Sequence, residues 1–321
     1  MLKKVTVFLA LLVLLVGLTP ALAQDSGTLG LSEADFALYT QGNSYSFDSI
    51  AFDYSFNLSI SQEALTLTGS GIGGKDANGS PVAQLTIAGG GALNGEQINV
   101  DLELRLVDNI LYLLDNTGDQ GWQGIPLEDA LDSAGGEDLG IDPDALAEGD
   151  LSGLGSMFED ATSLVDSGFV QMARLADSSV NGVNTAHFQM TFDFNTLLSS
   201  DFLKNILVSS EVLSGTDEEI DQQFQFFASF LGSYFQGMTL SFDQYIGIDT
   251  PRLEQAALNF GMSLQTVNEK QETITNTIGL TFDLTMTEYN PAVSVEVPAD
   301  VTMVDPEELE KLMQGVETGG F

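Results

Sequence analysis

Apolar and polar residues alternate with a period of two along much of this chain. The alternation is clearest at residues 52–60, 98–106, 188–192, 258–264 and 277–287. Successive side chains of a β-strand point to opposite faces, so each segment would present one apolar face to a core and one polar face to water. Such strands are typical of antiparallel sheets. The pattern therefore predicts a protein built mainly from antiparallel β-strands.

Helical signals interrupt the strands in the middle of the chain. Residues 156–159 and 216–219 each have the spacing of a capping box, in which a hydroxyl and a carboxylate satisfy the amides of a first helical turn. Apolar residues then recur at helical spacing over 220–235, and residues 195–213 form a second amphipathic candidate. A short helix is also expected after Pro126. These elements predict helices that pack on a sheet.

Three further segments differ in composition from the alternating parts. We expect residues 24–44 to be an N-terminal linker, residues 128–155 to be an acidic low-complexity insert, and residues 301–321 to be an acidic helical tail. Residues 45–300 would then form a single β-rich domain, because no repeat of 20–50 residues is visible.

The first residues have the pattern of an export signal. Lys3 and Lys4 precede an apolar run from Val5 to Leu18, which is shorter than the ~20 residues that a bilayer-spanning helix needs. Small residues ending at Ala23 resemble a cleavage site. We therefore expect a signal peptide at residues 1–23, cleavage after Ala23, and a soluble protein that is secreted or held in the periplasm or cell envelope. Gln24 is not the Cys that would carry a lipid, so no stable membrane anchor is expected.

Composition restricts the possible partners and chemistry. The chain has 47 acidic and 9 basic residues, a formal net charge of −38, and no Cys. Nucleic acids and anionic membranes would repel such a protein, and disulfides are excluded. The acidity is consistent with adaptation to salt or to an acidic exterior; a functional cation-binding surface is the alternative.

Catalytic motifs are sparse. His187 is the single histidine, it lies in an alternating segment, and no G-x-S-x-G motif accompanies it. Zinc sites need several His or Cys ligands. We therefore expect no catalytic residue, no metal and no cofactor, and we expect the single Trp122 to pack in or at the rim of the core.

Carboxylate motifs also fall short of a defined site. Asp142-Pro143-Asp144 begins like an EF-hand loop, but Leu146 occupies a ligand position. Residues 115–119 are more typical of a tight turn. With 47 acidic residues, a pair suited to glycoside hydrolysis cannot be identified from sequence.

Three short stretches together resemble the LppX/LprG-type proteins, which are relatives of the LolA and LolB lipoprotein carriers. They are the strand at 109–114 followed by Gly121-Trp122, the segment at 180–188, and the segment at 286–298 with its Tyr-Asn-Pro and alternating valines. The resemblance implies an α+β fold: a half-open antiparallel β-barrel with helices over its concave face and a lipid-holding cavity between them. It also implies a closing strand within the segment at 286–298.

Two main hypotheses for function follow. The first is an exported, non-enzymatic carrier or scavenger of a lipid or other acyl-chain ligand, with a donor or acceptor protein in the cell envelope as a conceivable partner. The second is a structural or interaction module with a filled core; an acid-dependent hydrolase is a weaker third. For the first hypothesis we expect the cavity to be lined by Phe56, Leu58, Leu102, Leu104, Phe224, Phe227, Leu231 and Phe282.

Overall fold

The computed structural model describes residues 28–76, 79–93, 95–133, 168–209, 212–235, 237–267 and 273–304. The expected leader at 1–23, the capping box at 156–159, the Asp142–Asp144 motif, most of the acidic insert and almost all of the tail lie outside these residues.

Thirteen strands of the described residues form one sheet, in the order β13-β6-β5-β4-β3-β2-β1-β12-β11-β10-β9-β7, with β8 paired to β9. Neighbouring strands are antiparallel except for β13 and β6. The strands are β1 (Ser49–Ile60), β2 (Glu63–Lys75), β3 (Pro81–Leu93), β4 (Glu96–Val107), β5 (Ile110–Asp115), β6 (Gln123–Pro126), β7 (Val170–Arg174), β8 (Ser178–Val180), β9 (Val183–Phe192), β10 (Thr239–Gly247), β11 (Leu253–Val267), β12 (Thr273–Tyr289) and β13 (Thr302–Met303).

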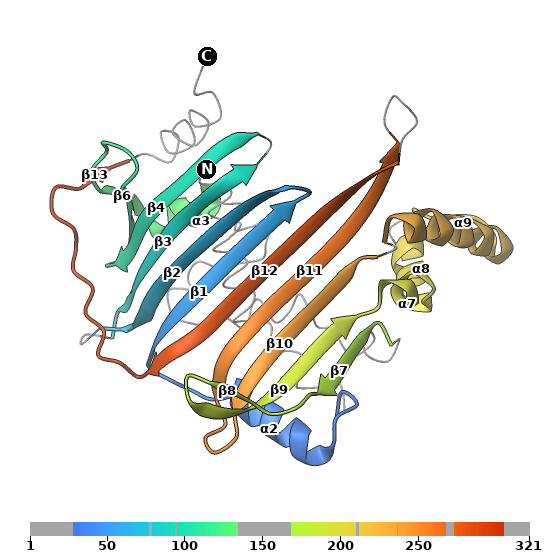
Figure 1. The fold of residues 1–321 in the computed structure, drawn as a ribbon, viewed down its shortest axis with the longest axis horizontal. Helices are drawn as coiled ribbons and strands as arrows, with labels where there is room; N and C mark the ends of the chain where they lie inside the picture. Colours follow the sequence, from blue (N-terminus) through green and yellow to red (C-terminus); the bar gives the residue numbers. More distant parts are fainter. Residues whose placement is uncertain are drawn as a thin grey trace.

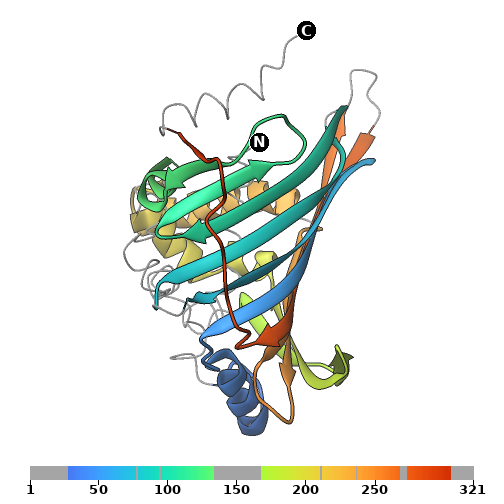
Figure 2. The same cartoon turned by 90° about the vertical axis from the view of Figure 1, so that its left-hand side faces the viewer.

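The sheet is strongly curved and open. β12, the second-last strand, pairs with β1, the first strand, at the middle of the sheet, while β13 and β7 form its edges (Figure 1). In profile, β3–β6 curl away from the plane of β10–β12 and leave a concave side (Figure 2). This arrangement confirms the half-open antiparallel barrel predicted from the sequence.

Five helices are described: α2 (Glu33–Asn43), α3 (Leu127–Ser133), α7 (Phe194–Leu198), α8 (Asp201–Ser209) and α9 (Asp217–Phe235). Helices α7–α9 form the connection between β9 and β10 and lie on the concave side, whereas α2 lies at the opposite ends of the strands (Figures 1 and 2). The short helix expected after Pro126 is confirmed as α3. At α9 the amide of Thr216 donates to the Glu219 carboxylate at 2.8 Å, half of the predicted capping box.

Two expectations differ in detail from the structure. The amphipathic candidate at 195–213 is two short helices, α7 and α8, because Asp193 and Ser200 each cap a new first turn through their side chains. The closing strand within 286–298, implied by the resemblance, is only partly present: β12 ends at Tyr289, residues 291–298 have no ladder of sheet hydrogen bonds, and β13 beyond them pairs with β6. Val293 and Val295 instead pack on the convex side of the sheet.

The segment after β12 crosses the convex face as a strap over β1–β6 (Figure 2). Val293, Val295 and Val301 contact a small apolar cluster of Val82, Val107 and Tyr112. Arg105 donates to the backbone oxygen of Glu296 at 3.1 Å, and its guanidinium lies 4.7 Å from the Trp122 ring centroid. Trp122 is thus a half-buried packing residue, as expected.

Glycines allow aromatic rings to lie flat on the concave face where the sheet bends. A Cβ at Gly69 would lie 1.8 Å from the Thr86 oxygen and 2.5 Å from the Tyr54 hydroxyl, which donates to that same oxygen at 2.7 Å. A Cβ at Gly71 would lie 2.3 Å from the Phe52 ring. Glycine in β2 therefore gives space to rings from β1, a device that accompanies curvature in sheets.

Candidate functional site

The concave face carries one continuous apolar floor. A middle row of paired residues crosses nine strands from β7 to β4 without a polar side chain. Its members are Met172, Met190, Phe242, Leu258, Phe282, Phe56, Leu67, Gly89 and Val100. Because the side-chain period of a strand is two, every second residue of each strand joins this face. The floor therefore follows directly from the alternation in the sequence.

The exposure of the floor changes along the strands. A lower row, toward α2, contains Phe188, Gln244, Ala256, Leu284 and Tyr54, and all of them are buried. An upper row, toward α7–α9, contains Leu240, Phe260, Leu280, Leu58 and Leu65, and all of them are only half-buried. The concave face is thus closed at one end, and apolar side chains remain accessible at the other.

The expected lining residues fall into two groups. Phe56, Leu102, Leu104 and Phe282 belong to the same cluster of the floor, with Phe56 half-buried, and Leu58 is half-buried in the upper row. Phe224 and Phe227 are on α9, which packs against α7, and neither belongs to that cluster. The side chain of Leu231 lies outside the described parts of the chain. The structure therefore brings together the four predicted members of the cluster, and Phe224 and Phe227 are not members of it.

Helix α2 closes the lower end with both apolar and polar contacts. Tyr39 is fully buried, and its ring meets the Phe188 ring edge-on at 5.4 Å. Gly42 allows the close approach, because a Cβ there would lie 2.4 Å from Ile246. A packed helix thus lies within the segment expected to be an N-terminal linker.

Polar residues in the lower row find their partners on α2. Gln244, 1% exposed, donates to the side-chain oxygen of Asn43 at 2.9 Å. Arg174, the cross-strand neighbour of Phe188, forms an ion pair with Asp35 at 3.5 Å. Burying a polar group without a partner costs about 1–3 kcal/mol, so the hydrogen bond between Gln244 and Asn43 favours one docking position for α2. In the sequence, the only signal is that Gln244 occupies a position where the alternation requires an apolar residue.

The hydroxyl of Tyr39 is an exception to this pairing. It is buried and has no hydrogen-bond partner among the described residues. Burial raises the pKa of this hydroxyl well above its ordinary value, so it stays neutral. A neutral hydroxyl without a described partner in an apolar cluster lowers the stability of the otherwise well-packed lower end.

The single histidine belongs to a polar network on the convex face. His187 Nε2 lies 2.7 Å from Asp243, and its ring stacks on Tyr245 at 4.3 Å. Asp243, 6% exposed, also accepts hydrogen bonds from Gln189 and Asn259. Burial, followed by the charge of Asp243, raises the pKa of Tyr245. The His187 imidazole thus belongs to a hydrogen-bonded network of strand side chains, an arrangement typical of a structural role.

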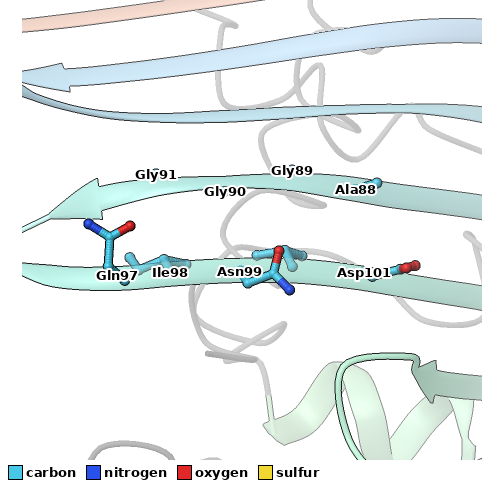
Figure 3. Close-up of a pocket in the computed structure, with 9 residues that line it drawn as sticks. Ala88, Gly89, Gly90, Gly91, Gln97, Ile98, Asn99 and Asp101 are labelled. Atoms are coloured by element: carbon cyan, nitrogen blue, oxygen red, sulfur yellow. The ribbon is translucent and has the colours of Figure 1, made fainter.

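A shallow hollow of about 530 Å³ lies where β3 ends and β4 begins (Figure 3). Its walls include main chain of Gly89, Gly90 and Gly91 and the side chains of Gln97 and Asn99. The hollow is open and lined by both polar and apolar residues, and it includes Gly89 and Val100 from the end of the middle row.

Searches for other kinds of site give limited results within the described ranges. No group of three or more His, Asp or Glu side chains there could hold a metal ion, and no described helix is long and apolar enough to cross a membrane. Residues 115–119 form the expected turn, in which Asp115 accepts from the amide and the hydroxyl of Thr117.

Comparison with known proteins finds similarity in structure but not in sequence. No family model and no curated protein matches the chain. The lipoprotein LppX of Mycobacterium tuberculosis is 12% identical with a TM-score of 0.33, and the match covers 83% of this chain and 100% of LppX. LprF of Mycobacterium bovis is 13% identical with a TM-score of 0.35, over 88% of this chain and 97% of LprF.

A third solved structure is an outer membrane lipoprotein-sorting protein domain from Vibrio parahaemolyticus. It is 8% identical with a TM-score of 0.21, and the match covers 82% of this chain and 93% of that domain. These structures agree with the resemblance to LppX/LprG-type and LolA-related proteins read from the sequence. With TM-scores below 0.5, they do not define a ligand or an activity for this chain.

Proposed function

We propose that this protein is an exported, non-catalytic carrier or scavenger that binds a lipid or another hydrophobic ligand on the concave side of its sheet. The observation that carries the proposal is the half-buried upper row, where large apolar side chains of five strands remain accessible. Removing such area from water stabilises a complex by roughly 25 cal/mol per Å², and apolar concavities with few polar groups are the usual form of ligand sites.

The dimensions of the floor suit an acyl chain. From Phe56 on β1 to Met172 on β7 the middle row spans five steps between neighbouring strands, or about 24 Å at ~4.8 Å per step. One leaflet of a ~30 Å hydrocarbon core is about half of that core, or ~15 Å. A membrane lipid chain could therefore lie along one row without leaving the apolar surface.

In this proposal, each predicted residue has a position relative to the ligand. Phe56 and Leu58 contact the chain directly, because they are half-buried. Phe282, Leu102 and Leu104 form the floor around them. Phe224, Phe227 and Leu231 of α9 approach from the helical side.

Export is part of the same proposal. The leader pattern at 1–23 and the absence of a Cys at position 24 support release after Ala23 without a lipid anchor. A donor or acceptor protein in the cell envelope would then load or unload the ligand. Determination of the N-terminal residue of secreted protein tests the cleavage; an N-terminus other than Gln24 contradicts it.

The binding proposal is tested by native purification followed by organic extraction and mass spectrometry, together with titration of a fluorescent fatty acid. We expect about one lipid per chain. The variant Leu58→Asp should reduce fatty-acid affinity at least tenfold, which is about 1.4 kcal/mol. Ser59→Asp is the matched control, because it places the same charge one residue away on the opposite face.

The alternative is a structural module whose concave face is filled by protein, and the fully buried lower row favours it at the α2 end. No extracted lipid and no fatty-acid binding, in protein whose circular dichroism shows a folded β-sheet, would establish that alternative. Equal affinity of Leu58→Asp and Ser59→Asp would show that the ligand does not use the upper row.

A further inference from the structure

The most exposed apolar side chains of the described residues gather on one helical lobe, α8–α9. Half of the exposed large apolar residues are there, and Phe226, at 76%, is the most exposed of all. Phe230, one helical turn later, is 53% exposed. Val208 and Val212 add to the same lobe. Monomeric proteins rarely expose several large apolar side chains together unless the surface meets a partner.

Helix α9 uses two different faces. Phe224 is buried and Phe227 is half-buried on the face that packs inward, while Phe226 and Phe230 project from the other face. The inward face explains the fold of the lobe, and an ion pair between Lys204 and Asp221 ties α8 to α9. The outward phenylalanines remain mostly exposed in the folded helix.

The charge of the lobe restricts what can cover these phenylalanines. The first turns of α9 carry Asp217, Glu218, Glu219 and Asp221, and the helix contains no basic residue. The chain as a whole carries a formal charge of −38. An anionic bilayer and a second copy of this chain would both be repelled. A charge-neutral lipid surface would not repel the lobe, and Phe is among the residues that helices lying in a bilayer interface bury there.

The lobe also lies at the accessible end of the concave face. Leu240 of the upper row follows α9 after only a few residues, and α2 closes the opposite end (Figure 1). An apolar chain moving between a bilayer and the upper row would take its shortest path past α9.

We infer that the outward face of α9, through Phe226 and Phe230, docks reversibly on a charge-neutral lipid bilayer. The inference rests on the proposed function only for its purpose, which is to bring the upper row to a membrane surface. Binding depends on apolar area and not on charge, so it is weak, resists salt, and decreases as anionic lipid is added.

The test is flotation of secreted protein, with its N-terminus determined, on phosphatidylcholine vesicles. Wild type should float with the vesicles in low and in high salt. The double variant Phe226→Ser/Phe230→Ser should lose at least 90% of the floated fraction. Val297→Ser/Met303→Ser is the matched control, because these residues are 50% and 53% exposed on the strap and on β13, and it should float as wild type does.

Several outcomes would overturn the inference. These are no flotation of wild type, equal loss in the control variant, or stronger binding to vesicles that contain phosphatidylglycerol. Concentration-dependent dimers in sedimentation that disappear in Phe226→Ser/Phe230→Ser would assign the face to a second copy. Fatty-acid titration without vesicles separates the two proposals, since Phe226→Ser/Phe230→Ser should bind the fatty acid with full affinity. Wild type that floats but does not bind fatty acid refutes only the proposed carrier function. Wild type that binds fatty acid but does not float refutes only the docking of α9.

Discussion

The two ends of the concave face differ in how the apolar side chains of the sheet are covered. At the lower end, α2 lies directly on the floor, with Tyr39 fully buried and Gln244 paired to Asn43. At the upper end, α9 packs on α7 and leaves Phe226 and Phe230 in solvent, while the nearby floor is half-buried.

The closed lower end contributes to stability, whereas the accessible upper end is suited to recognition of another molecule. Where polar residues occur in the floor, the chain supplies its own partners, and the docking of α2 becomes specific as well as tight. Where the floor is purely apolar, the chain supplies fewer contacts, and apolar area remains available to another molecule. Substitutions at the two ends should therefore differ first in their effect on stability.

The largest effect is expected from Tyr39→Ala. The change removes a fully buried ring that contacts Phe188, so it should lower the free energy of unfolding by about 3–5 kcal/mol. Phe226→Ala, at the exposed end, should change it by no more than about 0.5 kcal/mol. Urea denaturation of both variants measures the contrast, and similar losses would show that the ends do not differ.

A smaller effect is expected when the polar pair under α2 is broken. Gln244→Leu leaves the Asn43 oxygen without its donor, at a cost in the lower part of about 1–3 kcal/mol, because Asn43 is only half-buried. The double variant Asn43→Leu/Gln244→Leu should recover most of this loss, since no unpaired group remains. Additive losses in the double-mutant cycle would argue against the pair.

The substitution Tyr39→Phe should raise the free energy of unfolding, unlike the two preceding changes. The ring stays in place and a buried hydroxyl without a described partner is removed, so stability should rise by about 1 kcal/mol. The thermal midpoint and the urea midpoint should both increase. A clear decrease would reveal a hydrogen bond to this hydroxyl.

The smallest effect concerns acid. Hydrogen bonds from the amide and then the hydroxyl of Thr216 hold the pKa of Glu219 below its usual value, and bonds from Thr196 and then Asn195 do the same for Asp193 at α7. Both groups favour the folded state above their unfolded pKa, and this contribution is lost as the pH falls through the lowered folded pKa.

The amide of Asp35 at the start of α2 is instead capped by the hydroxyl of Ser32, which does not titrate in this range. Amide hydrogen exchange should therefore accelerate at the first turns of α7 and α9, relative to α2, as the pH falls through the lowered pKa of Asp193 and of Glu219. Glu219→Gln should reproduce the change at α9 at neutral pH. Equal acceleration at all three helices would contradict the assignment.

Local patterns in the sequence were sufficient to predict the strands, helix α9 and the apolar face of the sheet. Alternation at 52–60 and 277–287 predicted β1 and β12 and the side chains, such as Phe56 and Phe282, that share one face. Spacing over 216–235 predicted α9 and its inward Phe224. These predictions succeed because side-chain periodicity depends only on the local backbone. The contact of Phe224, Phe227 and Leu231 with a ligand stays a prediction.

The tertiary structure decided which of these local features meet. Gln244 looked like a break in the alternation until α2, about 200 residues earlier in the chain, supplied Asn43 as its partner. Gly69, Gly71 and Gly73 alternate along one face of β2, yet only Gly69 and Gly71 lie beneath aromatic rings, while a Cβ at Gly73 would have ordinary contacts. Phe224 and Phe226 are equally apolar and two residues apart, and packing buries one and exposes the other. The sequence determined the two faces of the sheet; only the packing of distant segments determined which end is closed and which remains accessible, because burial depends on partners that no local pattern encodes.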